Sequence, residues 1–202
     1  GQATAISAVI AVGVMMQVMM TGVVASLDQT RMAYYERYRL AEVYAPVTRA
    51  PNSLMPQILS IDGVANAESR VQGAALLDMP GISVPIQAQI VSVPDFGEPL
   101  LNNVLLTQGR YIDPDRTDEI LLLDAFAKAH GLGPGDHIAA TVYGAKRTFK
   151  IVGIAQSPEF LYTTAPGELV PDDSRFDVIW ARRSTLDAAF DMKGAFNEVI
   201  LS

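Results

Sequence analysis

Residues 3–24 read ATAISAVIAVGVMMQVMMTGVV, an apolar run without a charged side chain. An α-helix rises about 1.5 Å per residue, so the run reaches about 33 Å, enough to cross a hydrocarbon core of about 30 Å. We therefore predict a membrane span here. The residues that mark its length are Ala3, Val9, Val14, Met20 and Val24.

The helical pattern continues beyond the span, because residues 25–40 contain neither Gly nor Pro. Tyr34, Tyr35 and Tyr38 lie there among arginines, a mixture typical of the place where a helix leaves the membrane interface. We predict a stalk that continues unbroken to residue 40. The three tyrosines are candidates for contact with the domain that follows, or for simple anchoring at the interface.

Other interpretations of the apolar run are disfavoured. Residues 23–25, Val-Val-Ala, resemble a signal-peptide cleavage site, but the apolar core is longer than the usual 7–15 residues or so, and Gly1 and Gln2 carry no positive side chain. A buried helix of a soluble protein rarely has so long a stretch without charge. The methionines in the run are expected to face lipid or neighbouring helices rather than a soft metal.

The composition of the 202-residue chain limits its partners. Its net charge of −7 and the absence of a basic stripe argue against binding to nucleic acid. The chain contains no cysteine, which excludes disulfides, zinc–thiolate sites and thiol catalysis.

Beyond residue 40 the pattern predicts a compact α+β domain in which hairpins dominate. Pro46 indicates an edge position for the first strand, and Gly131 a left-handed cap for the second helix. Loop residues 94–103 suggest a boundary between two portions of the domain. The predicted strands are 41–48, 64–78, 82–93, 119–123, 137–143, 147–155, 176–181 and 196–201, and the predicted helices are 54–61, 124–130 and 184–192.

The predicted hairpin of residues 64–93 turns near Pro80 and carries apolar side chains at its tip. We expect most of these to pack on a neighbouring sheet, with an exposed contact surface as the alternative. They are Leu76, Leu77, Met79 and Ile82.

The patterns that would mark a bound nucleotide or calcium ion are incomplete. The sequence GLGPGD at 131–136 lacks the Lys-Ser/Thr of a P-loop and precedes a predicted strand. Asp113, Asp115 and Asp118 resemble the start of a calcium loop, but Asp118 stands where that loop requires Gly, and no Glu occupies the twelfth position. We expect neither a cofactor nor a metal.

Catalytic patterns are incomplete as well. His130 and His137 do not have metal-ligand spacing, and Ser157 lacks the GxSxG context of a nucleophile elbow. The expectation is that the chain is not an enzyme and has no catalytic residues.

Several short motifs occur in a characteristic order. In order they are DGV at 62–64, QGRYI at 108–112, EILLLDAFAKAHGLGPGD at 119–136 and TFKIVGIA at 148–155. Behind a membrane helix, this order resembles that of FtsX-like ABC transporter permeases with a MacB-like periplasmic core domain, over essentially the whole chain. AQSPEFLY at 155–162 is similar to one bacterial subgroup of these permeases.

The resemblance implies a domain organisation. Residues 1–40 would be the span and stalk, 41–94 and 175–202 a β-α-β portion called Porter, and 95–174 an inserted β-rich portion called Sabre. In the family a further helix and strand and more membrane spans follow, so Porter would be incomplete here and would expose a sheet edge.

The resemblance also implies a function. Residues beyond 40 would lie outside the cytoplasm, at a bacterial inner membrane, and the partners would be membrane lipid, a separate cytoplasmic ABC ATPase and a periplasmic protein or lipoprotein. The full permease would be a homo- or heterodimer. ATP hydrolysis would drive export or mechanical work in the periplasm, with the continuous helix as lever. The alternative is a membrane-anchored or secreted binding or sensor domain without an ATPase.

Overall fold

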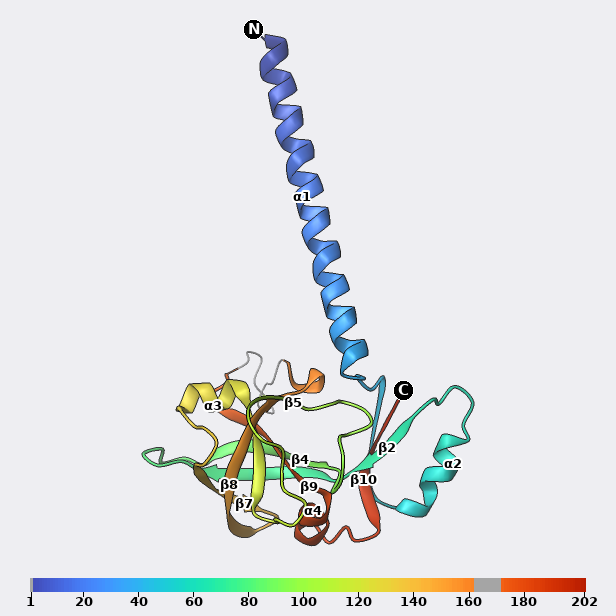
Figure 1. Cartoon of the computed structure of the whole chain (residues 1–202), viewed down its shortest axis with the longest axis vertical. Helices are drawn as coiled ribbons and strands as arrows, with labels where there is room; N and C mark the ends of the chain where they lie inside the picture. The colour runs from blue at the N-terminus through green and yellow to red at the C-terminus, as the bar shows by residue number, and fades with distance from the viewer. Residues whose placement is uncertain (1, 162–171) are drawn as a thin grey trace. The chain divides into compact units, whose positions relative to one another are not determined.

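A computed structural model describes residues 2–161 and 172–202 of the chain. The chain divides into two compact units, Gly1–Arg37 and Tyr38–Ser202. The first unit is the helix α1 (Gln2–Arg37), and the second is a domain that contains all the strands of the described residues (Figure 1). The predicted α+β class with an apolar N-terminal helix is confirmed.

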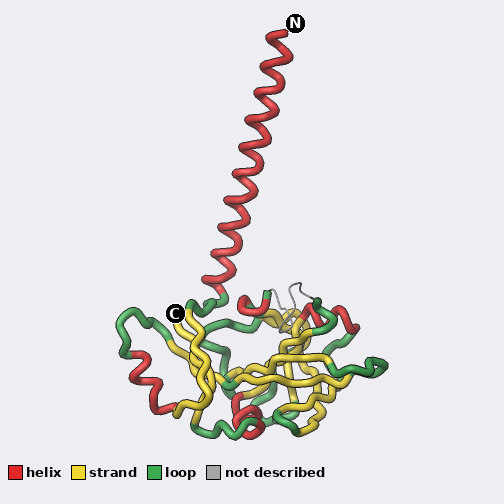
Figure 2. Tube along the Cα trace, turned by 180° about the vertical axis from the view of Figure 1, so that it is seen from behind, coloured by secondary structure: helices red, strands yellow, loops and turns green. Residues whose placement is uncertain are grey.

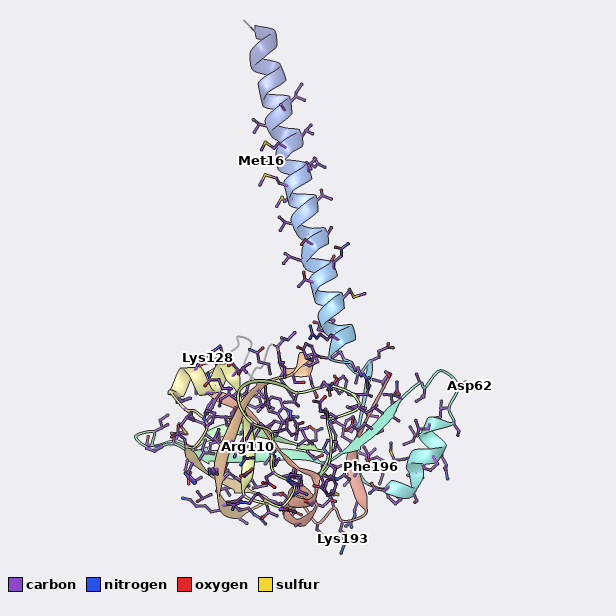
Figure 3. The ribbon with its side chains drawn as sticks, in the orientation of Figure 1. Met16, Asp62, Arg110, Lys128, Lys193 and Phe196 are labelled. Carbon is purple, nitrogen blue, oxygen red and sulfur yellow. The ribbon has the colours of Figure 1, made fainter. Side chains whose placement is uncertain are left out.

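Helix α1 is one continuous element of 36 residues. Its segment Ile10–Thr30 has a mean hydropathy of 1.9 and is long and apolar enough to cross a membrane. None of that segment is buried within the protein, and side chains project from it on all sides (Figure 3). The helix ends at Arg37 and does not reach the predicted residue 40, because Arg39 has φ +50°, a left-handed conformation that terminates helices.

The domain has a small lobe built on a three-stranded antiparallel sheet in the order β1-β10-β2. Its strands are β1 (Val43–Pro51), β2 (Ala67–Arg70) and β10 (Ala195–Leu201). As predicted, Pro46 lies on an edge strand, and the register of β1 shifts just after it. In Figure 2, β1 and β10 are the long pair of strands that ends near the C-terminus.

A short helical segment covers one face of the small sheet. It consists of η1 (Asn52–Leu54) and α2 (Met55–Leu59), shorter than the predicted helix over 54–61. Ile58 packs against a small core that contains Phe196 and Val199. Asp62 follows α2 on the outer side of the lobe (Figure 3).

The large lobe contains seven strands in the order β5-β8-β6-β9-β4-β3-β7. Because β7 also pairs with β8, six of the strands form a closed ring, and β5 is added alongside β8. Two of the pairings, β4 with β9 and β6 with β8, are parallel. The strands are β3 (Gln72–Asp78), β4 (Ile86–Val93), β5 (Leu105–Gly109), β6 (Glu119–Leu123), β7 (His137–Val142), β8 (Ala145–Gln156) and β9 (Phe176–Arg182).

Two short helices, α3 (Asp124–His130) and α4 (Arg183–Ala189), follow β6 and β9. Since β6 and β9 are antiparallel neighbours, the helices lie at opposite ends of the ring (Figure 1). Phe126 of α3 and Leu186 of α4 are fully buried in its core. Gly131 has φ +64° and ends α3 in the predicted left-handed cap. A third helical turn, η2 (Pro158–Phe160), follows β8.

The predicted long strand over 64–78 is wrong in one respect. It divides at Val71: β2 joins the small sheet, and β3 joins the large lobe and forms the predicted hairpin with β4. The expected helix over 184–192 begins one residue earlier and ends at Ala189.

Strand pairing also crosses the predicted lobe boundaries. Strands β3 and β4 belong to the range 41–94, and β9 to 175–202, yet all three pair within the large lobe. The domain organisation stays a prediction, with one portion formed by 41–94 and 175–202 and another by 95–174. The hydrogen-bonded sheets divide the chain at Val71 and again between Arg182 and Ala195.

Candidate functional site

The backbone that begins at Tyr38, directly after α1 in the chain, and ends at Ala41 forms what we call the anchor segment. Three hydrogen bonds hold it to a loop of the domain. The backbone N–H of Asn103 donates to the Tyr38 carbonyl at 2.9 Å, and that of Asn102 donates to the Arg39 carbonyl at 2.8 Å. The N–H of Ala41 donates to Oδ1 of Asn102 at 2.7 Å.

Asn102 links the anchor segment to the interior of the domain. Its φ of +52° lies in the left-handed region, which asparagine adopts more readily than most residues. Its Nδ2 donates to the Tyr44 hydroxyl at 3.0 Å and to Oε2 of Glu159 at 2.7 Å. Asn102 is buried. Leu101 beside it is buried with Ala41 and Ile200.

Glu159, which accepts from Asn102, also binds a buried arginine, Arg70, and a second carboxylate binds the same arginine. Arg70 donates to Glu159 through both terminal nitrogens, with Nη1 to Oε2 at 2.6 Å, and its Nε donates to Oε2 of Glu198. The side chains of Arg70 and Glu198 are each 6% exposed, and that of Glu159 is 12% exposed. The Tyr44 ring lies 5.7 Å from the guanidinium carbon, close enough for a cation–π contact.

Burial and pairing act against each other in this cluster. Burial opposes the charge of Arg70, but its bonds to Glu159 and Glu198 outweigh burial and raise its pKa. Burial raises the pKa of Glu198, and Arg70 only partly offsets that effect. Burial and the Glu159 charge raise the pKa of Tyr44 to about 12. The buried guanidinium therefore keeps its charge, and both carboxylates remain hydrogen-bonded to it.

The cluster joins the two lobes, because Arg70 and Glu198 belong to the small lobe and Glu159 to η2 of the large lobe. A reciprocal pair lies nearby: the N–H of Gln72 donates to Oδ1 of Asn197 at 2.8 Å, and Nδ2 of Asn197 donates to the Gln72 carbonyl at 2.7 Å. The Asn197 side-chain amide thus makes the two hydrogen bonds with the Gln72 backbone that a neighbouring strand would make.

Arg183 at the start of α4 adds two further bonds between the lobes. Its Nη1 donates to the Ser69 carbonyl at 2.9 Å and its Nη2 to the Ala195 carbonyl at 2.5 Å. The hydrophobic cores of the two lobes are separate clusters. The junction is therefore held largely by directional polar bonds, which fix the orientation of one lobe on the other.

The sequence matches no known protein-family profile. No curated protein matches it significantly.

Three solved structures are similar to this chain. The extracellular domain of the noncanonic ABC-type transporter YknZ from Gram-positive bacteria has 10% identity and a TM-score of 0.46, over 82% of this chain and 80% of that one. The periplasmic region of MacB from Actinobacillus actinomycetemcomitans has 12% identity and a TM-score of 0.46, over 80% and 66%. A permease domain from Porphyromonas gingivalis has 11% identity and a TM-score of 0.39, over 81% and 63%.

Identities this low give no correspondence between residues, so no residue role is carried over from these structures. The chain spans less than two thirds of the second and third of these structures. The first of these structures is named as a domain of a transporter and the third as a domain of a permease.

The residues predicted to mark the span lie on α1, and Val14, Met20 and Val24 are exposed there. The side chains of Ala3 and Val9 lie outside the described part of the chain.

Of the predicted interface tyrosines, Tyr35 and Tyr38 are half-buried and each interacts with other groups. The side chain of Tyr34 lies outside the described residues. A role of these tyrosines in docking stays a prediction. What the structure adds is the backbone carbonyl of Tyr38, which is part of the anchor segment.

The side chains at the predicted hairpin tip do not all face the same way, because successive residues of a strand point to opposite faces. Leu77 is fully buried and Met79 packs on the core of the large lobe. Leu76 and Ile82 are 44% and 42% exposed. The tip therefore contributes to the core and also leaves apolar surface open, so its role as a contact site stays a prediction.

Several of the side chains weighed as catalytic or metal-binding have other partners. Oδ1 of Asp113 accepts from the N–H of Asp115, and Asp118 pairs with Arg116. The Ser157 hydroxyl lies 3.4 Å from the Asn102 carbonyl. Across residues 2–161 and 172–202, no three acidic or histidine side chains gather as a metal site would require.

Sequence reasoning missed the residues that connect the anchor segment to both lobes. Arg70 is 89 residues from Glu159 and 128 from Glu198, and nothing local marks them as partners. One signal was available: Asn102-Asn103 in a loop rich in turn residues is a typical site for a left-handed backbone.

Proposed function

We propose that this chain is the extracytoplasmic domain, with one membrane span, of an ABC transporter permease subunit in a bacterial inner membrane. A separate cytoplasmic ATPase would supply the energy. The domain would turn movement of the span into export or mechanical work on a partner protein or lipoprotein outside the cytoplasm.

The anchor segment is the observation that carries this proposal. A simple tether needs only a flexible linker between its membrane helix and its domain. Here the residues directly after an unbroken 36-residue helix are bonded to Asn102 and Asn103. Asn102 is in turn bonded to Glu159, which holds Arg70. A displacement of the anchor segment is thus passed to both lobes.

The span supports the same proposal. The segment Ile10–Thr30 is long and apolar enough to cross a membrane, and none of it is buried within the described part of the chain. A surface of this kind is stable in lipid and unfavourable in water. The ordered sequence motifs support a separate ATPase, because the permeases that they resemble work with one.

The test is to purify the affinity-tagged permease from its own bacterium and to identify the proteins that accompany it. We expect an ABC ATPase subunit in the complex. Its absence from a membrane-integrated, folded preparation would overturn the proposal in favour of a binding or sensor domain.

A second experiment tests rigid transmission. A flexible Gly/Ser linker of about six residues is inserted between Arg37 and Tyr38, and the variant is tested for complementation of a deletion strain. We expect membrane integration and ATPase binding to persist while complementation is lost. The control places the same linker in the exposed turn between Gly144 and Ala145 and should complement.

One observation favours the binding-domain alternative. The outer side of the β3–β4 hairpin carries an open groove of about 540 Å³, lined by residues that include Leu76, Gln87 and Phe176. A sensor domain without an ATPase would use such a groove for its ligand. The purification experiment separates the two functions.

A further inference from the structure

The groove on the outer face of the β3–β4 hairpin has the size of a ligand site. Its volume of about 540 Å³ falls within the range of about 300–1,000 Å³ that is usual for such sites. The side chains that point outward here come from alternate residues of the two strands. The residues between them, such as Leu77 and Ile90, are buried in the core of the large lobe.

The strand register places two large apolar side chains on either side of Gln87. Leu76 is its partner on β3, and Phe176 is its partner on β9. Two residues further along β4, Gln89 is paired with Ala74, which is exposed and carries only a methyl group. The small side chain of Ala74 leaves room in the groove for an apolar group of a ligand.

The two glutamines on β4 have hydrogen-bonding groups that are not used. Nε2 of Gln89 donates to Oε1 of Gln72, whose Nε2 donates to Oε1 of Glu198, and these bonds orient the Gln89 amide. Among the described residues, nothing pairs with Oε1 of Gln89 or with the side-chain amide of Gln87. A primary amide offers both donors and an acceptor, so it is complementary to another amide.

The lining of the groove is uncharged. None of the described residues that line it is Asp, Glu, Lys or Arg, although the chain has a net charge of −7. A charged group of a ligand would lose its hydration there without gaining a counterion, which is costly. The groove therefore favours a ligand that combines neutral amide groups with an apolar side chain.

We propose that this groove binds an uncharged, extended peptide segment of a partner protein. Gln87 and Gln89 are two residues apart on one face of β4, which corresponds to about 6.6–6.8 Å. An extended peptide has the same repeat, so its backbone amides meet both glutamines when it lies along β4. An aliphatic side chain of the peptide fills the space over Ala74.

A peptide fits the groove better than a lipid does. An acyl chain would match the apolar lining but would leave both glutamine amides without partners, whereas a peptide matches both features. The peptide could belong to the partner protein of a permease or to the ligand of a sensor. The inference is therefore independent of whether an ATPase accompanies the chain.

The test begins with the full-length protein in lipid nanodiscs, because free detergent would compete for an apolar groove. A phage library of random seven-residue peptides is selected against it, with empty nanodiscs as the background. We expect enriched peptides that lack charged residues and share one aliphatic position. Their affinity is then measured by fluorescence polarisation of the labelled peptide.

Substitution of Ala74 tests the location of the site. Ala74→Leu fills the space over the strand and should weaken binding by about ten-fold or more. The matched control is Ala65→Leu, the same change at an exposed alanine before β2, which should leave binding unchanged. Urea midpoints of both variants show whether the fold is retained.

Loss of an amide tests the hydrogen bonds. Gln87→Leu should weaken binding by about three- to ten-fold, as expected for one hydrogen bond. Gln57→Leu, at an exposed glutamine of α2, should have no effect. N-methylation of the peptide tests the spacing: binding should fall for methyl groups on two residues that lie two apart, and not for the residue between them.

The proposal is overturned if no peptide is enriched over empty nanodiscs, or if binding survives Ala74→Leu in a folded protein. Native mass spectrometry distinguishes the other occupants. A bound lipid that Ala74→Leu removes would assign the groove to an acyl chain, and pairs of chains that Ala74→Leu separates would assign it to a second copy. Either result would also overturn the proposal, while the proposed function would still be decided by the ATPase purification.

Discussion

Asp177, at the start of β9, is fully buried. Its Oδ1 accepts from the N–H of Val178 at 2.8 Å, and its Oδ2 has no partner among the described residues. Burial raises the pKa of this carboxyl well above its usual value. The folded protein therefore holds a proton that the unfolded chain releases above a pH of about 4.

This difference predicts a pH dependence of stability. Because the folded state binds more protons at Asp177, the free energy of unfolding falls as pH rises above about 4, until the folded-state pKa is passed. Asp177→Asn should remove that contribution. Urea unfolding of both proteins in detergent, at several values between about pH 4 and 8, should give a smaller decline for the variant. Parallel curves would show that the carboxyl does not hold its proton.

Asn102 gives a second prediction at this scale. Asn102→Gly removes the side-chain bonds to Ala41, Tyr44 and Glu159, and should lower the free energy of unfolding by about 1–3 kcal/mol. Asn102→Ala loses the same bonds and also places a less tolerant residue at positive φ, so it should cost about 1 kcal/mol more. Equal losses in urea unfolding would argue against the left-handed backbone.

Among the elements, β3 depends on a glycine. A Cβ at Gly73 would lie 2.3 Å from Cζ of Phe190, which follows α4. Gly73→Ala should therefore destabilise the domain by about 1–3 kcal/mol through overpacking. The loss should be much smaller when Phe190→Ala is already present, because the clash is gone. Urea unfolding of the two single variants and the double variant measures this coupling, and additive losses would contradict it.

The elements also show what the sequence could predict. Strand β6 and helix α3 occupy the predicted residues, because an apolar run, a helical stretch and Gly131 are local signals. The division at Val71 was not predictable in this way, since Arg70 pairs with Glu198 and Gln72 pairs with Val91. The partners of Arg70 are also distant in the sequence, so no local pattern could predict that Glu159 and Glu198 bind it.

For the whole molecule, the junction between the lobes yields the largest predicted effect. Arg70→Met leaves Glu159 and Glu198 buried without their cation, which should cost about 3–5 kcal/mol in the free energy of unfolding. Adding Glu159→Gln and Glu198→Gln to Arg70→Met should recover much of this loss. Urea unfolding measures both.

A matched control is the exposed pair of Arg116 and Asp118. Arg116→Met should leave the urea midpoint nearly unchanged, since solvent screens exposed pairs. If the two arginine variants had similar midpoints, the buried cluster would not be what holds the lobes together.

The polar junction between the lobes also determines how the domain responds to a pull. A hydrogen bond is lost once its atoms separate beyond about 3.5 Å, whereas apolar surfaces can slide while remaining in contact. A junction of this kind does not deform gradually under a small force. Its hydrogen bonds hold until the lobes separate by about one ångström, and they are then lost. If α1 moves the domain as we propose, a movement smaller than that threshold would reach both lobes undiminished, whereas a larger one would separate the two lobes.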